Sequence, residues 1–231
     1  MKKFLAAGFI FTLLLVYNNG LSQEMTNGKT NQITLPVFEI GIKGGLSMAG
    51  FFWTGDNGWN NSTMFVFMPV IWAVTTWNIT ESIALQLEGG YCGKGSSIDA
   101  SDGFAHWYYH YFDFPVFIKF QQIDGDMRFY AGAGGYFAKT IAGFYDFNVP
   151  RDSYFLGKGD MTISESGAQT NLKPYDYGLV FNCGIQNYHW VFEFRFTISL
   201  SSVMEFTPPV IYGDTRGALN SGIILTAGYT L

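Results

Sequence analysis

The segment HWVFEFRFTISLSSV, residues 189–203, alternates between apolar and polar side chains along its central part. Phe192 and Phe194 lie on one parity, and Glu193 and Arg195 lie on the other. Because successive side chains of a β-strand point to opposite faces, a period of two predicts a strand with one apolar and one charged face. A charged face buried in an apolar medium costs free energy unless its charges are paired. The medium that each face meets therefore decides the fold.

The same alternation recurs along the chain between turn-forming residues, and it predicts eight strands. Most of them are longer than the five or six residues that are typical of globular domains, and they suit a tilted membrane strand of ~9–11 residues plus its ends. The second predicted strand is weaker because it is apolar on both faces, and the fifth is rich in glycine. The predicted strands cover residues 37–50, 64–77, 83–95, 106–121, 127–144, 175–186, 190–203 and 219–231.

The connections between these strands alternate in length. NITES, IDGD and NYH join the second strand to the third, the fourth to the fifth and the sixth to the seventh. The other connections are longer and cover residues 51–63, 96–105, 145–174 and 204–218. Short turns at one end and long loops at the other are typical of bacterial outer-membrane barrels. The sequence therefore predicts an all-β fold, an eight-stranded antiparallel up-and-down transmembrane β-barrel.

Composition indicates which face of each strand meets the lipid. Charged residues make up 13% of the chain, against about 25% in average proteins, and aromatic residues make up 19%. The polar faces carry scattered charges of both signs, which suits the interior of an eight-stranded barrel, where side chains fill the space and opposite charges can pair. The predicted structural charge network of the lumen consists of Glu39, Lys43, Glu88, Asp113, Lys119, Arg128, Asp176, Glu193 and Arg195.

Aromatic residues gather near both predicted ends of the strands, as in the interfacial girdles of membrane barrels. The group expected near the short turns is Trp77, Tyr188, Trp190 and Tyr229. The group expected near the long loops is Phe51, Phe52, Trp53, Tyr108 and Tyr109.

The N-terminus has the pattern of a secretory signal. Lys2 and Lys3 precede an apolar core that is shorter than the ~20 residues of a spanning helix, which makes a membrane anchor the weaker alternative. We therefore expect a signal peptide over 1–22, a short periplasmic lead over 23–36 and the barrel over 37–231, in the outer membrane with both termini periplasmic. The net charge of −5 argues against a nucleic-acid partner.

Several segments resemble the PorT-type family of outer-membrane β-barrel proteins. The similar segments are EIGIKGGLSMAGF, SIALQLEGGYCGKGS, YFDFPVFIKF, FYAGAGGYFAKT, YDYGLVFNCGI and FEFRFTISLSSV, and the likeness covers nearly all of residues 37–231. The resemblance implies an eight-stranded outer-membrane barrel. It also implies an accessory role in a protein secretion or gliding assembly, which is known for some members of this family. The family has no catalytic motif to carry over.

The histidines are the first candidates for chemistry. His106 and His110 lie near the outer rim beside several aspartates, where a rim hydrolase or acyltransferase is the enzymatic alternative. Residues four apart on a strand are separated by ~13 Å, too far for one metal ion. We expect no enzyme activity, no metal and no cofactor. Cys92 and Cys183 are expected on opposite faces, without a disulfide.

Two alternatives for function remain. The chain is either a structural or interaction barrel in outer-membrane lipid, or a soluble, exported lipocalin-like carrier of an apolar ligand. In a carrier the phenylalanines would point inward and the charged residues outward. The connection 145–174 is either a contact surface for other envelope proteins or a flexible cap over the barrel mouth.

Overall fold

The computed structural model describes most of the chain beyond its N-terminal segment. The described residues are 35–53, 63–100, 103–148, 156–163, 171–206 and 216–231. The predicted signal peptide and nearly all of the predicted lead lie outside them. Among the described residues, no helix is long and apolar enough to cross a membrane.

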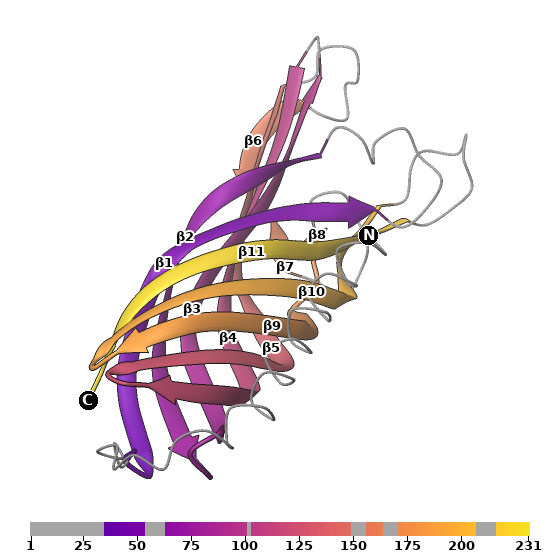
Figure 1. Ribbon diagram of the computed structural model, residues 1–231. Helices are drawn as coiled ribbons and strands as arrows, with labels where there is room; N and C mark the ends of the chain where they lie inside the picture. The colour runs from indigo at the N-terminus through magenta and orange to yellow at the C-terminus, as the bar shows by residue number, and fades with distance from the viewer. Residues whose placement is uncertain (1–34, 54–62, 101–102, 149–155, 164–170, 207–215) are drawn as a thin grey trace.

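Eight long strands form a closed antiparallel barrel (Figure 1). They are β1 (Phe38–Trp53), β2 (Thr63–Asn78), β3 (Ile83–Ala100), β4 (Gly103–Asp124), β5 (Met127–Asn148), β9 (Tyr175–Asn187), β10 (Trp190–Phe206) and β11 (Arg216–Thr230). Each strand pairs with the next one of this set in the sequence, and β1 pairs with β11, so the sheet has no free edge within the barrel. Closure satisfies the backbone groups that an open edge would expose to lipid. The all-β, eight-stranded prediction is confirmed.

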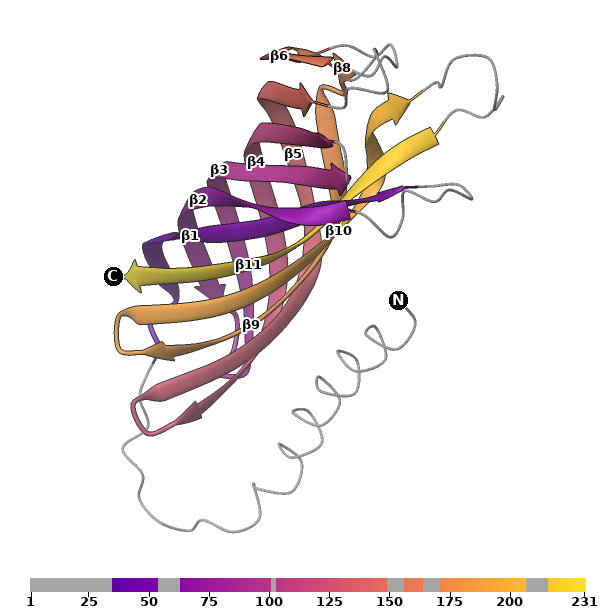
Figure 2. The same cartoon turned by 90° about the horizontal axis from the view of Figure 1, so that it is seen from above.

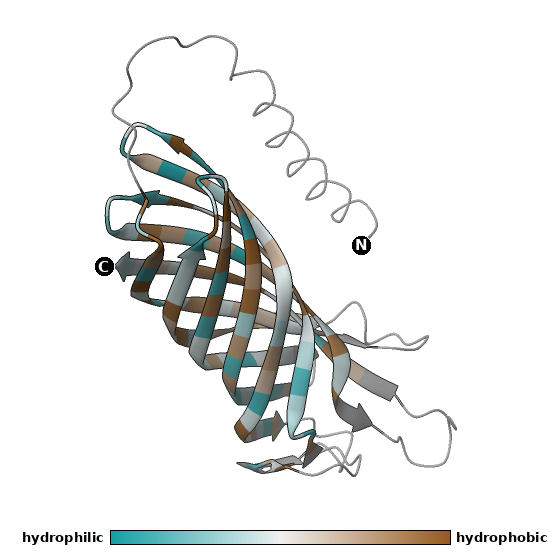
Figure 3. Cartoon of the chain, turned by 90° about the horizontal axis from the view of Figure 1, so that it is seen from below, coloured by the Kyte–Doolittle hydropathy of each residue, from teal (hydrophilic) through white to brown (hydrophobic). Residues whose placement is uncertain are grey.

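Hydrophobic and hydrophilic residues alternate along many of the strands (Figure 3), and this alternation gives the barrel two unlike surfaces. In β4, every odd-numbered residue from Ala105 to Gln121 is buried, and every even-numbered residue from Phe112 to Gln122 is exposed. The even positions carry Phe112, Phe114 and the apolar residues that follow them. The barrel therefore has an apolar outer surface and an interior that holds the polar side chains.

The three short turns lie together at one end of the barrel, with the C-terminus (Figure 2). Gly125 between β4 and β5 has a φ of 58°, and Tyr188 between β9 and β10 has a φ of 51°. Such left-handed positions suit glycine and are uncommon for other residues, so Tyr188 adopts a tight-turn conformation at some cost. The Tyr188 hydroxyl donates to Asp126 across the two turns at 2.8 Å, and this hydrogen bond together with the negative charge raises the pKa of Tyr188.

The other end differs from the sequence prediction at two connections. Residues 96–105 were predicted as a loop, but β3 and β4 stay paired as far as Ala100 and Gly103. The connection 145–174 contains three short strands that the sequence pattern did not predict: β6 (Leu156–Asp160), β7 (Thr162–Ile163) and β8 (Asn171–Leu172). β6 pairs with the outer part of β5, and β7 and β8 form a small parallel ladder.

Candidate functional site

All nine residues of the predicted charge network are buried and belong to the inward parity of their strands. Seven of them belong to three ion-paired clusters along the lumen.

The central cluster joins two cations to two carboxylates. Nη2 of Arg195 lies 2.7 Å from Glu88 Oε2 and 2.5 Å from Glu193 Oε1. Nζ of Lys43 lies 2.5 Å from Glu88 Oε1 and 2.9 Å from Glu193 Oε2. Each cation therefore contacts both carboxylates, and the cluster links β1, β3 and β10. Mutual pairing of this kind offsets the cost of burying the four charges.

Aromatic rings complete the surroundings of the arginine. The guanidinium carbon of Arg195 lies 4.4 Å from the ring centroid of Trp72 and 4.7 Å from that of Phe117. Both distances fall within the ~6 Å range of a cation–π contact. The planar guanidinium therefore gains stabilisation from the rings as well as from the carboxylates.

A second cluster lies near the short turns. Nη1 of Arg128 lies 2.7 Å from Glu39 Oε1, to which Nδ2 of Asn78 also donates at 2.7 Å. Gln186 donates to the other oxygen of Glu39 at 3.2 Å. Glu39 thus has a charged partner and two amide donors at the base of the lumen.

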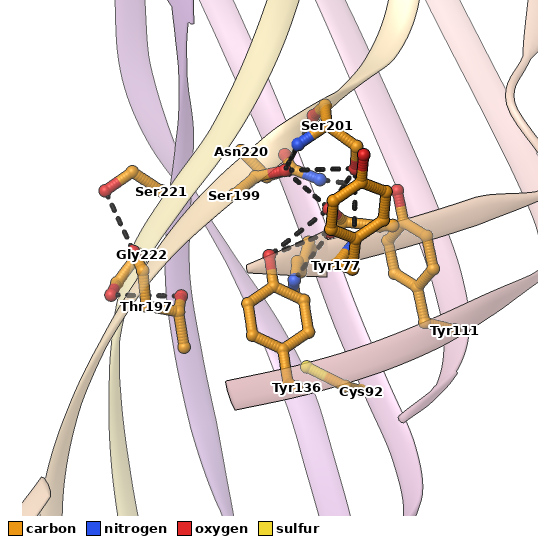
Figure 4. Close-up of polar contacts among 12 residues, drawn as sticks. Cys92, Tyr111, Tyr136, Tyr177, Thr197, Ser199, Ser201, Asn220, Ser221 and Gly222 are labelled. Atoms are coloured by element: carbon orange, nitrogen blue, oxygen red, sulfur yellow. Dashed lines mark hydrogen bonds and ion pairs between the residues drawn. The ribbon is translucent and has the colours of Figure 1, made fainter. Parts of the chain in front are cut away.

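The third cluster surrounds Asp176 toward the long-connection end, and Figure 4 labels three residues of this cluster, Tyr136, Ser199 and Ser201. Its Oδ2 lies 3.0 Å from Nζ of Lys94. The hydroxyls of Ser199 and Ser201 donate to its Oδ1 at 2.5 and 3.1 Å, and that of Tyr136 donates at 3.2 Å. Lys94 was not among the predicted network residues, although its parity on the third strand places it on the charged face.

Lys119 and Asp113 differ from the other network residues. Lys119 donates to Gln86 at 2.8 Å and lies 3.7 Å from the ring centroid of Tyr130. Oδ1 of Asp113 is buried and has no hydrogen-bond partner among the described residues, and no ion pair joins the Asp113 carboxylate to another described residue. These two residues lie in the lumen, but they do not take part in the ion pairs described above.

The buried charges balance in number. Five cations face five carboxylates among the described lumen residues: Lys43, Lys94, Lys119, Arg128 and Arg195 face Glu39, Glu88, Asp113, Asp176 and Glu193. Eight strands leave an interior that is only wide enough for side chains to fill. The arrangement can therefore hold a narrow barrel together without a net internal charge.

The orientation of β10 decides between the two fold alternatives. Phe192 and Phe194 are 54% and 44% exposed, whereas Glu193 and Arg195 are 4% and 1% exposed. This is the opposite of what a lipocalin-like carrier requires. The carrier alternative is therefore not favoured, because the apolar side chains meet the surroundings of the barrel and not its interior.

The aromatic residues follow the prediction at the short turns and in part at the other end. Trp77, Tyr188, Trp190 and Tyr229 are exposed around the short turns. At the other end, Tyr108 lies on the outward parity of β4, and the side chains of Phe52 and Trp53 lie outside the described part of the chain. Phe51 and Tyr109 are buried inside the barrel, so their assignment to an outer girdle was wrong. The physical reason is parity, since both residues occupy inward positions of their strands.

The histidines of β4 lie on the outer side of the wall. Nδ1 of His110 lies 2.6 Å from the hydroxyl of Tyr91, and the ring of His106 stacks on Phe104 with centroids 4.6 Å apart. The described residues contain no group of three or more side chains that could hold a metal ion. Cys92 and Cys183 are both free thiols.

Parts of the connection 145–174 fold into the barrel mouth. The side chains of Met161 and Leu172 are buried. The amide of Met161 donates to the carbonyl of Gly143 at 2.7 Å, and that of Lys173 donates to the carbonyl of Val203 at 2.9 Å. The described ends of this connection are therefore attached to the inner wall, while Thr162 and Ile163 between them are exposed.

The comparison with protein-family models agrees with this architecture. A family model described as "Outer membrane protein beta-barrel domain" matches residues 22–205. The sequence comparison with curated proteins found no match.

Among solved structures, the chain is similar to the outer membrane protein OprG from Pseudomonas aeruginosa, with 10% identity and a TM-score of 0.44 over 84% of this chain and 95% of that one. It is also similar to Neisserial surface protein A, with 9% identity and a TM-score of 0.42 over 84% and 97% of the two chains. The assignment of the fold rests on the strand pairings described above.

Proposed function

The chain belongs to the family of outer membrane protein β-barrel domains, and on this premise we propose that it serves as a closed structural and interaction barrel. It is an outer-membrane β-barrel protein. The observation that carries the proposal is the charge-balanced lumen, in which the ion pairs of Arg195 and Lys43 occupy the middle of an eight-stranded barrel. A lumen filled in this way suits a role at the surface of the barrel rather than transport through it.

Conductance measurements test the closed lumen. The full chain, reconstituted into a planar lipid bilayer, is expected to give no steady single-channel current, with a wide porin in the same bilayer as the positive control. A stable current from the natural chain would contradict the closed barrel, because ions would then be passing the central cluster.

The interaction role is assigned to the connection 145–174. Support comes from the exposed residues Thr162 and Ile163, which the attachments of Met161 and Lys173 hold over the mouth. The finer part of the proposal follows the PorT-type resemblance: the partner is another envelope protein, and the barrel is an accessory of a secretion or gliding assembly. No catalytic step forms part of the proposal.

Photocrosslinking in native outer membranes tests the partner. A photoreactive amino acid at Thr162 is expected to form a crosslink to a defined envelope protein, and one at Thr80 in a short turn at the other end serves as the matched control. Crosslinks to lipid alone from Thr162, or the same product from both positions, would argue against the interaction role.

The proposed orientation is that both termini and the three short turns face the periplasm after removal of residues 1–22. The position of the C-terminus beside the short turns supports it (Figure 1). Protease treatment of intact cells is expected to cleave a tag inserted at 164–170 and to leave a C-terminal tag intact.

A further inference from the structure

The outer wall of the barrel has a hollow near the end that carries the long connections. Its volume is about 490 Å³, and the residues that line it include Met68, Tyr108, His110, Phe144, Asp146 and Asp160. Tyr108 and His110 occupy the outward parity of β4. Tyr108 pairs with Phe144 in the β4–β5 ladder, and Phe144 pairs with Asp160 in the β5–β6 ladder. These three residues therefore form one row across neighbouring strands, on the outer side of the wall and not in the lumen.

A glycine of β3 makes room for the opposite side of the outer-wall hollow. Gly93 pairs with His110 in the β3–β4 ladder. A Cβ atom at Gly93 would lie 2.7 Å from the Cβ atom of Met68, closer than real Cβ contacts. Met68 of β2 therefore packs directly across the backbone of Gly93 and provides an apolar side to the hollow.

The ring of His110 is held in place by two neighbours. Its Nδ1 lies 2.6 Å from the hydroxyl of Tyr91. Its ring centroid lies 5.4 Å from that of Phe144, with an angle of 82° between the ring planes. Such an edge-to-face arrangement is favourable for aromatic rings. Because protein groups alone fix these rings, a ligand does not bear the entropic cost of ordering them.

The charged residues among the described lining of the hollow have one sign. They are Asp146 and Asp160, and this lining contains no lysine or arginine. Asp160 is exposed, and no hydrogen bond or ion pair joins its carboxylate to another described residue. The aromatic residues Tyr108 and Phe144 belong to the same row as Asp160. Carboxylates and aromatic ring faces both attract an organic ammonium group, and carboxylates repel anions.

The outer-wall hollow borders the apolar surface of the barrel. The outward residues that follow His110 on β4 are Phe112 and Phe114, which are both 44% exposed. A molecule whose polar part occupies the hollow can therefore place its apolar part along these phenylalanines. Burial of that apolar part is favourable, and a small soluble cation has none to bury. The position of the hollow thus favours a lipid over a soluble ligand.

We infer that the outer-wall hollow binds the headgroup of a membrane lipid that carries an ammonium group. The carboxylate of Asp160 and the rings of Tyr108 and Phe144 recognise the ammonium, while the acyl chains follow Phe112 and Phe114. Asp160 belongs to the connection 145–174, yet the site does not depend on a protein partner of that connection.

Native mass spectrometry of the natural chain in detergent micelles tests the site. The probes are dioleoyl phosphatidylethanolamine and dioleoyl phosphatidylglycerol, which share their acyl chains and differ in the headgroup ammonium. Asp160→Asn is expected to lower the affinity for phosphatidylethanolamine about threefold, the effect of one exposed ion pair, and not to lower that for phosphatidylglycerol. Phe144→Leu removes the ring but stays apolar, and it should act similarly. Asp124→Asn, an exposed acid at the short-turn end of β4, is the control and should change neither affinity.

Four outcomes would overturn the proposal. Equal affinity of the natural chain for the two lipids would mean that the ammonium is not recognised. A preference for phosphatidylglycerol would mean that cations such as Lys158, whose side chain lies outside the described residues, dominate the hollow. A preference for phosphatidylethanolamine that survives in both Asp160→Asn and Phe144→Leu would place the lipid elsewhere. Competition by free phosphoethanolamine at the same concentration as the lipid would identify a soluble ligand in its place.

Discussion

Arg195 illustrates how single side chains hold the barrel together. Its guanidinium contacts Glu88 of β3 and Glu193 of its own strand, and it lies between the rings of Trp72 and Phe117. Burying a charge is costly, and the cost is offset only while its partners remain. The loss of one partner should therefore be far more damaging than the loss of an exposed charge.

Substitution of Arg195 by methionine tests this expectation. Arg195→Met leaves two carboxylates with only Lys43 as a charged partner, so we expect a loss of about 3–5 kcal/mol in the free energy of unfolding. Urea titration of the chain in liposomes, followed by the mobility of unheated samples on gels, measures the change. Lys139→Met, which removes an exposed cation from β5, is the control and should not lower stability. Equal stability of Arg195→Met and the natural chain would contradict a structural role for the central cluster.

Parity in the sequence was sufficient to place side chains inside the lumen, but it was not sufficient to pair them. Lys43 and Glu193 are 150 positions apart in the chain, and only the register of β1, β11 and β10 brings them together. Asp113 and Lys119 share the charged parity, yet neither has an ion-pair partner in the described lumen. Lys94 was left out of the predicted network although it contacts Asp176, because its sequence neighbours are glycines and serines that indicate a rim.

At the scale of the element, the long strands follow the sequence pattern closely in the middle and poorly at their outer ends. All eight predicted strands are present, and the ends at the short turns agree within a few residues. The outer ends of β3 and β4 were missed because residues 96–105 are rich in Ser, Asp, Gly and Ala, which favour turns. These outer ends are strands because each pairs with the other, and the composition of a segment does not reveal such a pairing.

The glycines of β5 provide a matched test of strand packing. A Cβ atom at Gly134 would collide with the backbone carbonyl of Val116, whereas a Cβ atom at Gly135 would lie 3.4 Å from the carbonyl of Gly178. Gly134→Ala should therefore push β5 away from β4 and lower stability by on the order of 1–3 kcal/mol, and Gly135→Ala should be tolerated. The urea midpoints of the two variants give the comparison. Two equal midpoints would mean that the β4–β5 ladder is not as close as described.

At the scale of the whole molecule, the two surfaces of the barrel are opposite to those of a soluble protein. The phenylalanines of β4 and β10 meet the surroundings, and the charges are enclosed. The sequence predicted this orientation from the low content of charged residues, which could not cover a water-exposed surface. It did not predict that Met161 and Leu172 are buried at the mouth of the barrel, because both lie in a connection without strand periodicity.

A lysine on the outer surface tests the lipid contact. Phe194→Lys places a charge in the apolar band, where we expect a loss of about 2–4 kcal/mol if the position lies near the bilayer midplane. Ser82→Lys in the exposed turn between β2 and β3 is the control and should change stability little. Unfolding from liposomes by urea measures both. A water-exposed outer surface would instead tolerate the lysine at position 194 about as well as the one at 82.

The equal number of positive and negative side chains in the lumen restricts how descendants of this sequence can diverge. A single substitution that reverses the charge of one lumen residue leaves an excess charge inside the barrel. Counter-ions from solution cannot readily enter this space. Substitutions at these positions therefore survive in compensating sets, so that an acid gained on one strand accompanies a base gained, or an acid lost, on another. Related barrels should consequently differ in which residues carry the charges while their internal sum stays near zero.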